Sequence, residues 1–168
     1  LLGAIIEKVS GVTWGKYLQD NFFNPLEMNS TYYNDLGIKG EANGYYKGRK
    51  SYDDAHIVHP SASFAAGAIA STVDDIWKWN KAVFSGKVVP IGLLENAWRP
   101  VVLNNGSTRP YGFGWQMKGE NENRAIGHGG TIDGFQSFAW YVPASKVFVV
   151  VLSNNMGANP GEYTSKIL

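Results

Sequence analysis

The chain has 168 residues, of which 44% are hydrophobic and 17% are charged. Its 15 Lys and Arg residues almost balance its 14 Asp and Glu residues, and a net charge of +1 gives no electrostatic reason to expect nucleic acid or an anionic membrane as a partner. The absence of cysteine excludes disulfides and thiolate nucleophiles, and no apolar run approaches the ~18 residues that span a bilayer.

Two short helices are predicted at the start. Apolar residues recur at helical spacing from Leu2 to Val9, and Gly11 is a typical helix stop. Thr13 is the expected N-cap of the second helix, which ends before Asn24-Pro25. Because the chain opens inside an apolar helix, we expect it to be a fragment of a longer protein whose targeting signal lies elsewhere.

The middle of the chain is predicted to form an excursion and two further helices. Residues 29–59 are polar and tyrosine-rich, which favours a long loop with short strands. Residues 71–75, Ser-Thr-Val-Asp-Asp, resemble a capping box that opens a helix ending at Gly86. Pro90 is expected in the first turn of a short helix that runs to about Trp98.

Strands are predicted after residue 110. The expected strands are residues 111–117, 125–130, 135–142 and 147–152. The last two are joined by a Pro143–Lys146 turn and predict an antiparallel hairpin. Because residues 147–152 are all apolar, we expect that strand to be buried on both faces. A loop over 154–160 and a helix from Tyr163 complete the chain.

Three histidines are candidate functional residues. His56 and His59 follow two aspartates, but their spacing matches no zinc pattern, and we interpret them as solvated loop residues. His128 lies in Gly127-His128-Gly129-Gly130-Thr131 at a predicted strand end. Glycines there would let a ligand approach the backbone, as an oxyanion site requires. Taken alone, the segment is also open to a second interpretation, a glycine bulge with an incidental histidine.

The segment His128-Gly129-Gly130-Thr131, with the apolar strand and Ser153-Asn154 that follow, resembles the third motif and hairpin of the serine β-lactamase-like family. That family includes class C β-lactamases, penicillin-binding carboxypeptidases, D-aminopeptidases and esterases. Four other stretches resemble family segments in the same order, although Glu27 replaces a usual glycine. They are residues 1–11, 25–31, 66–75 and 111–115.

The resemblance implies a mixed α/β (α+β) fold, an antiparallel sheet flanked by helices. Residues 1–168 would be the C-terminal part of one such domain. Its expected parts are a helical and loop segment at 1–100, a sheet segment at 110–154 and the start of a C-terminal helix at 161–168. With the partner strand of the family's sheet missing, the strand at 147–153 would present an unpaired edge open to self-association.

The resemblance also implies acyl transfer through a serine ester, without a metal or organic cofactor. His128 would act electrostatically on a substrate carboxylate or on a tyrosine proton relay. Gly129 and Gly130 would keep the substrate-binding wall flat, and the backbone N–H of Thr131 would be an oxyanion-hole donor. The substrate would be a small amide or ester, such as a β-lactam, a D-amino-acid peptide or an ester.

The family's remaining motifs are absent from these 168 residues. No Ser-x-x-Lys occurs, and Tyr32-Tyr33-Asn34 matches Tyr-x-Asn only as a string in the wrong place. We therefore expect this fragment alone to be inactive. The alternative is a non-catalytic module of the same fold that binds cell-wall peptides or a protein. Family habit favours a periplasmic or secreted location, which nothing in these residues indicates.

Overall fold

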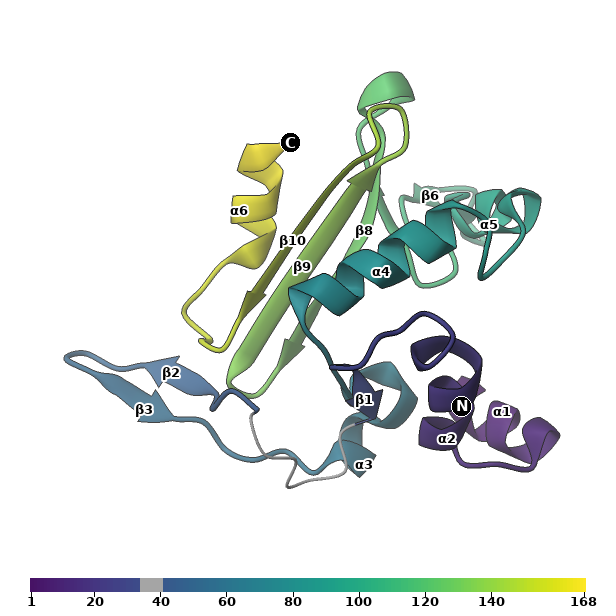
Figure 1. Ribbon diagram of the computed structural model, residues 1–168. Coiled ribbons are helices and arrows are strands. Elements are labelled where there is room, and N and C mark those ends of the chain that lie inside the picture. Colours follow the sequence, from purple (N-terminus) through teal and green to yellow (C-terminus); the bar gives the residue numbers. More distant parts are fainter. Residues whose placement is uncertain (34–40) are drawn as a thin grey trace.

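The computed structural model describes residues 1–33 and 41–168 (Figure 1). The α-helices are α1 (Leu2–Ser10), α2 (Trp14–Leu18), α3 (Pro60–Ser63), α4 (Val73–Phe84), α5 (Ile91–Ala97) and α6 (Pro160–Ile167). Single π- or 3₁₀-helical turns are η1 (Gln19–Phe23), η2 (Phe64–Ala66) and η3 (Asn121–Asn123). The short strands are β1 (Tyr32–Tyr33), β2 (Tyr45–Lys47), β3 (Tyr52–Asp54), β4 (Ile69–Ala70), β5 (Val101–Val102) and β6 (Thr108–Arg109). The main strands are β7 (Gln116–Lys118), β8 (Ala125–Ile132), β9 (Phe135–Val142) and β10 (Val147–Ser153).

The two N-terminal helices begin and end where the sequence predicts. Gly11 closes α1 in the left-handed conformation, with φ 75°. The Thr13 hydroxyl accepts a hydrogen bond from the Lys16 N–H and so caps α2. The helix continues into η1 and stops before Pro25. A small apolar core forms here from Leu18, Phe23 and Met28, with Trp79 of α4 packed against it.

One buried carboxylate ties the loop after these helices to α4. Asp75 is 2% exposed, and its Oδ2 accepts hydrogen bonds from the Ser30 N–H (2.7 Å) and the Thr31 hydroxyl (2.9 Å). Lys78 donates to its Oδ1 at 2.7 Å. Thr72 caps α4 as predicted, because its hydroxyl oxygen accepts a hydrogen bond from the Asp75 N–H. The Asp75 carboxylate does not complete the expected capping box, because the donors from Ser30, Thr31 and Lys78 occupy it.

Removal of this carboxylate should destabilise the protein in a pH-dependent way. Burial alone would raise the pKa of Asp75, but the hydrogen bonds from Lys78, Ser30 and Thr31 and the Lys78 charge bring it below its ordinary value. As the pH falls, Asp75 is therefore protonated in the unfolded state before it is protonated in the folded state. The contribution of its carboxylate to folding stability is complete above about pH 4 and disappears as the pH falls through the folded-state pKa. We expect Asp75→Asn to cost about 2 kcal/mol at pH 7.

Urea unfolding of the wild type and of Asp75→Asn between pH 7 and pH 3 measures this effect. The difference in unfolding free energy should shrink as the pH falls. Asp74→Asn, an exposed neighbour in the same helical turn, is the matched control and should change stability by less than about 0.5 kcal/mol. A constant difference between wild type and Asp75→Asn across this range would contradict the assignment.

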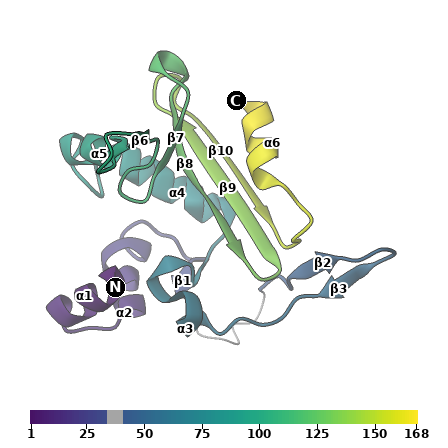
Figure 2. The same cartoon turned by 180° about the vertical axis from the view of Figure 1, so that it is seen from behind.

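The main sheet is antiparallel, with the strand order β10-β9-β8-β7. The predicted hairpin is confirmed: β9 and β10 pair from Val142↔Val147 to Gln136↔Ser153. Helix α4 crosses one face of this sheet (Figure 1), and α6 covers the other face, seen from behind in Figure 2. The expected class, an antiparallel sheet flanked by helices, is therefore the fold of this chain.

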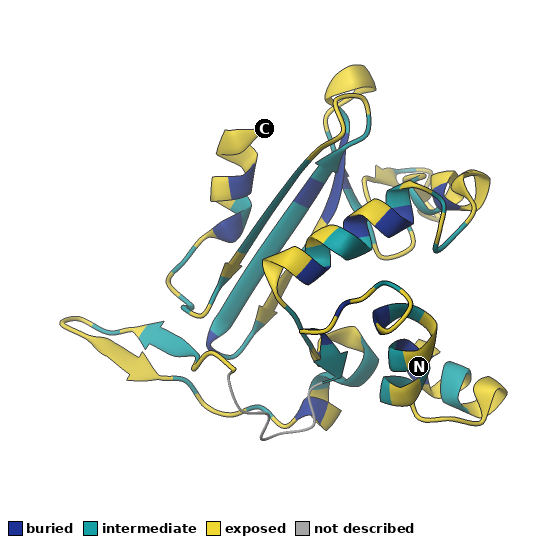
Figure 3. Cartoon of the chain, viewed as in Figure 1, coloured by how far each residue is buried: buried dark blue, intermediate teal, exposed yellow. Residues whose placement is uncertain are grey.

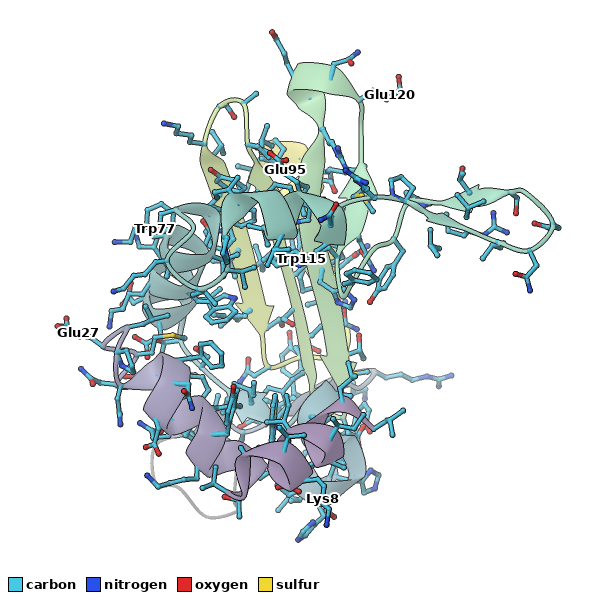
Figure 4. All side chains as sticks on the ribbon, turned by 90° about the vertical axis from the view of Figure 1, so that its right-hand side faces the viewer. Lys8, Glu27, Trp77, Glu95, Trp115 and Glu120 are labelled. Carbon is cyan, nitrogen blue, oxygen red and sulfur yellow. The ribbon has the colours of Figure 1, made fainter. Side chains whose placement is uncertain are left out.

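Aromatic side chains fill the space between α4 and the sheet. Phe84 of α4 lies 3.9 Å from Tyr141 and 5.2 Å from Trp98, measured between ring centroids. Trp115 meets the same ring edge-on, and Trp77 stacks on Phe148 of β10. Figure 4 labels Trp77 and Trp115 in this layer. Aromatic pairs in such arrangements contribute about 1 kcal/mol each beyond the area they bury, so this layer fixes α4 on the sheet.

Residues 111–117 do not form the predicted strand. Only Gln116–Lys118 is a strand, and Tyr111 makes a single bridge to Gln116. Gly114 adopts φ 78°, and the Gly112 N–H bonds to the Trp115 carbonyl, so the chain turns back on itself. Alternation of large residues with glycine is typical of such a turn as well as of a strand, which explains the wrong prediction.

The predicted burial of the strand at 147–152 is wrong. No residue of β10 is fully buried, and Val147 and Leu152 are 41% and 39% exposed, because α4 and α6 leave the strand ends uncovered (Figure 3). The expected C-terminal helix is present as α6 and begins at Pro160, slightly before the predicted starts at 161 and 163, because Asn159 caps it. Among residues 1–33 and 41–168, β10 has only β9 as a neighbouring strand, so its expected free edge is present. Self-association through that edge stays a prediction.

The turn between β8 and β9 is held by a hairpin from the middle of the chain. Gly134 adopts φ 82°, and a Cβ there would lie 2.7 Å from the Gly44 Cα. Tyr46 of β2 donates a hydrogen bond to the Asp133 carboxylate in the same turn. The exposed β2–β3 hairpin therefore starts at the end of β8 and projects away from the sheet (Figure 1).

In the part of the chain that the structure describes, no helix is long and apolar enough to cross a bilayer.

Candidate functional site

The glycine-rich segment of the sequence forms the second half of β8, and its residues alternate between the two faces of the sheet. His128 shares a face with Ile126, whose partner Tyr141 packs against α4. Thr131 and Gly129 lie on the opposite face, where α6 packs. The structure thus places all of the predicted site residues on one strand but divides their side chains between two faces.

His128 is exposed and its imidazole has two hydrogen-bond partners. Its Nε2 lies 2.9 Å from the Tyr111 hydroxyl, and its Nδ1 lies 2.5 Å from the carbonyl oxygen of Gly129. The Tyr111 and His128 rings meet edge-on, with centroids 5.6 Å apart. The ring is therefore held on the surface of β8 in a defined orientation and is not packed among apolar neighbours.

The positions around His128 require glycine for different structural reasons. A Cβ at Gly127 would lie 1.9 Å from the carbonyl oxygen of Ala139 on β9, and one at Gly129 would lie 2.6 Å from the Phe138 ring. Packing against β9 accounts for these two glycines without any ligand. Gly130 is different: it is exposed, and a Cβ there would meet only the Ser137 hydroxyl, at 2.8 Å. Gly130 is thus the glycine that keeps the exposed surface beside His128 flat.

Beyond Gly127, β8 has a free side. Strand β7 pairs with β8 only from Ala125 to Gly127, and within the described residues no other strand continues along that side. His128 and Thr131 lie in this unpaired half, and Thr131 is exposed. Backbone groups on a free strand side can bond to an extended ligand or to a developing oxyanion.

Two cavities lie elsewhere on the molecule. One, of about 630 Å³, is lined by Lys118, Val147 and the end of α6, and the other, of about 560 Å³, by Trp98, Arg99 and Arg124. Neither is lined by residues 127–131. The exposed surface around His128 therefore lies outside both of these cavities.

The other candidate residues do not join His128. His56 is exposed beside Asp133, and His59 caps α3 through Ser61, which agrees with their interpretation as loop residues. Among the residues that the structure describes, no three His, Asp or Glu side chains cluster as metal ligands would. Tyr32 donates to Glu41, and burial together with that carboxylate raises its pKa to about 12, which disfavours Tyr32 as a proton acceptor. Asn34 lies outside the described residues.

Tyr111 contacts His128, although it was not among the residues predicted to form the site. Residues 111–115 were predicted to be part of a strand and resemble a family segment, but no role in the site was assigned to them. The sequence did contain a signal for this contact, because residues 111–115 directly precede the strand before the histidine segment. Strand β7 pairs with β8 and brings Tyr111 beside His128.

Comparisons with known proteins agree on one family. A family model with the description Beta-lactamase matches residues 1–166. Penicillin-binding protein 4* of Bacillus subtilis is 26% identical, over 100% of this chain and 40% of the relative. The D-aminopeptidase of Gluconobacter oxydans is 24% identical, over 94% of this chain and 30% of the relative. The D-stereospecific amidohydrolase of a Streptomyces species shares the fold, with a TM-score of 0.80 and 22% identity over 98% of this chain and 50% of that chain.

The chain therefore spans 40% or less of the length of these curated relatives.

Proposed function

Since the chain belongs to the beta-lactamase family, we propose that residues 127–131 form one wall of the acyl-transfer site of a serine hydrolase. The observation that carries the proposal is the exposed histidine on the unpaired half of a glycine-rich strand. The family match over residues 1–166 supports this assignment over an incidental glycine bulge. Residues 1–168 would then be the C-terminal part of one catalytic domain.

The nucleophile belongs to polypeptide outside these residues, because the 168 residues contain no Ser-x-x-Lys. In the proposed reaction the serine oxygen bonds to the substrate carbonyl carbon, the bond to the leaving amine or alcohol breaks, and the leaving group takes up a proton. Water then hydrolyses the acyl-enzyme and regenerates the serine. Residues 1–168 alone would have no turnover, because positioning groups cannot replace a nucleophile.

Each residue of the wall has a distinct proposed role. The N–H of Thr131 donates to the oxyanion of the tetrahedral intermediate, an interaction of a kind whose loss costs ~3 kcal/mol of transition-state stabilisation. His128 contributes electrostatically from the α4 face of β8 and orients the substrate. Gly130 leaves the surface between them open, since it carries no side chain.

The substrate we propose is a small amide, with a D-amino acid next to the scissile bond. Two relatives and one structural neighbour support this choice: their names are penicillin-binding protein, D-aminopeptidase and D-stereospecific amidohydrolase. A small ester would fit the same reaction. No metal or organic cofactor is needed for it.

Covalent labelling tests the proposal. The full-length polypeptide that carries residues 1–168 is treated with a fluorescent penicillin and, separately, with a fluorophosphonate, and the adduct is located by peptide mass spectrometry. We expect an adduct with at least one probe, on a serine outside residues 1–168. Absence of any adduct, together with binding of a D-amino-acid peptide, would instead favour a non-catalytic binding module.

A further inference from the structure

We propose that the Tyr111 hydroxyl is the group through which His128 acts at this site, and that it holds the His128 imidazole in its Nδ1–H form. The inference rests on the proposed function for its role in catalysis, but its geometry is independent of it. The Tyr111 hydroxyl lies 2.9 Å from Nε2, and the Gly129 carbonyl oxygen lies 2.5 Å from Nδ1. Both nitrogens of the ring are therefore engaged.

The chemistry of these two partners determines where the proton lies. A backbone carbonyl oxygen can only accept, so Nδ1 must carry the proton that bonds to Gly129. In a neutral imidazole the other nitrogen then has only a lone pair. Nε2 accordingly accepts a hydrogen bond, and the Tyr111 hydroxyl is its donor. The structure thus assigns both the tautomer of His128 and the direction of the Tyr111 hydrogen bond.

The same contacts determine whether a His128 nitrogen or the Tyr111 hydroxyl can bond to a ligand. When His128 is protonated, its two N–H groups donate to Gly129 and to the Tyr111 oxygen, so neither is free for a substrate. The Tyr111 hydroxyl proton is then released from Nε2 and can bond to an anionic or carbonyl oxygen. Tyr111 is 40% exposed, so its oxygen can reach such a ligand. The imidazole would act on the substrate through this hydroxyl.

The loop that carries Tyr111 is fixed by packing and hydrogen bonds. The Tyr111 carbonyl accepts from the Val101 N–H at 3.0 Å, and its N–H donates to the Arg109 carbonyl at 2.7 Å. A Cβ at Gly112 would lie 1.9 Å from the Ala97 carbonyl oxygen, so the loop sits directly against the end of α5. Trp115 closes the loop by packing on Phe84. The hydroxyl is therefore placed before any ligand binds, which is how a preorganised group acts.

Nitrogen NMR of the histidine side chains tests this arrangement in the full-length polypeptide. The spectrum is recorded at a pH where His128 is neutral, and its signals are assigned by their loss in His128→Gln. We expect Nδ1 to give the protonated-nitrogen signal and Nε2 the signal of a hydrogen-bonded lone pair. In Tyr111→Phe the Nε2 signal should move toward that of an unbonded lone pair. Tyr163→Phe, an exposed tyrosine on α6, is the matched control and should leave both signals in place.

Kinetics give the second measurement. Tyr111→Phe should lower kcat/KM for a D-amino-acid amide by about 100-fold, because the His128 imidazole would act on the substrate through this hydroxyl. A wild-type spectrum with the proton on Nε2, or an Nε2 signal that Tyr111→Phe does not move, would overturn the inference. Because the spectra need no turnover, an inactive wild-type protein would contradict the proposed function and leave this test intact.

Discussion

Replacement of His128 by Gln should lower kcat/KM for a D-amino-acid amide, and the rate of covalent labelling, by about 100-fold. Positioned side chains that stabilise charge or transfer protons contribute about 10²–10⁴-fold to rate, and His128 is proposed to act through Tyr111 without contacting the reacting atoms, so the low end applies. The side chain is exposed on β8, so the free energy of unfolding should change by less than about 0.5 kcal/mol.

The control for this prediction is His56→Gln. That histidine is also exposed, with 87% of its side chain accessible, and lies beside Asp133 in the turn that follows β8. It should retain wild-type kinetics. If His128→Gln kept activity within about 2-fold of the wild type, the smallest effect that one hydrogen bond produces, His128 would have no role in the reaction.

Replacement of Gly127 by Ala should destabilise the protein by about 3 kcal/mol, the upper end of the usual cost of overpacking. The added Cβ would lie 1.9 Å from the Ala139 carbonyl oxygen and 2.7 Å from the Trp140 ring. The first contact is with the backbone of the neighbouring strand, so no side-chain rotation relieves it. Strands β8 and β9 would have to separate in the middle of the sheet.

Gly130→Ala is the matched control for that variant. It adds the same methyl group three residues along the same strand, but its only close contact is the Ser137 hydroxyl, which can rotate away. Urea unfolding should show a loss of less than about 1 kcal/mol for Gly130→Ala. Equal losses in the two variants would contradict the distinction between a packing glycine and a surface glycine.

Much of the fold could be predicted because its signals are local. Thr13 and Thr72 cap helices as their positions predict, and the Pro143–Lys146 turn joins two strands in the expected antiparallel hairpin. The errors arise where distant segments decide the outcome. The exposure of β10 depends on where α4 and α6 end, and no periodicity within residues 147–152 contains that information.

The candidate site was predictable in part for the same reason. The spacing of glycines around His128 predicted a strand there, and the family resemblance predicted the role of that strand in the site. The faces were not predictable from composition, because Gly129 and Gly130 are the same residue type with opposite surroundings. Tyr111 and His128 are 17 positions apart in the sequence. Their contact depends on a turn at residues 112–115, which were predicted to form a strand.

A crystal structure of the full-length protein with a covalent acyl adduct tests the central claim most directly. We predict that the acyl carbonyl oxygen lies about 2.7–3.1 Å from the Thr131 backbone nitrogen, the range for an oxyanion donor, with the Tyr111 hydroxyl facing the bound group. An adduct whose carbonyl oxygen is held by other donors, with the exposed half of β8 facing solvent, would contradict it.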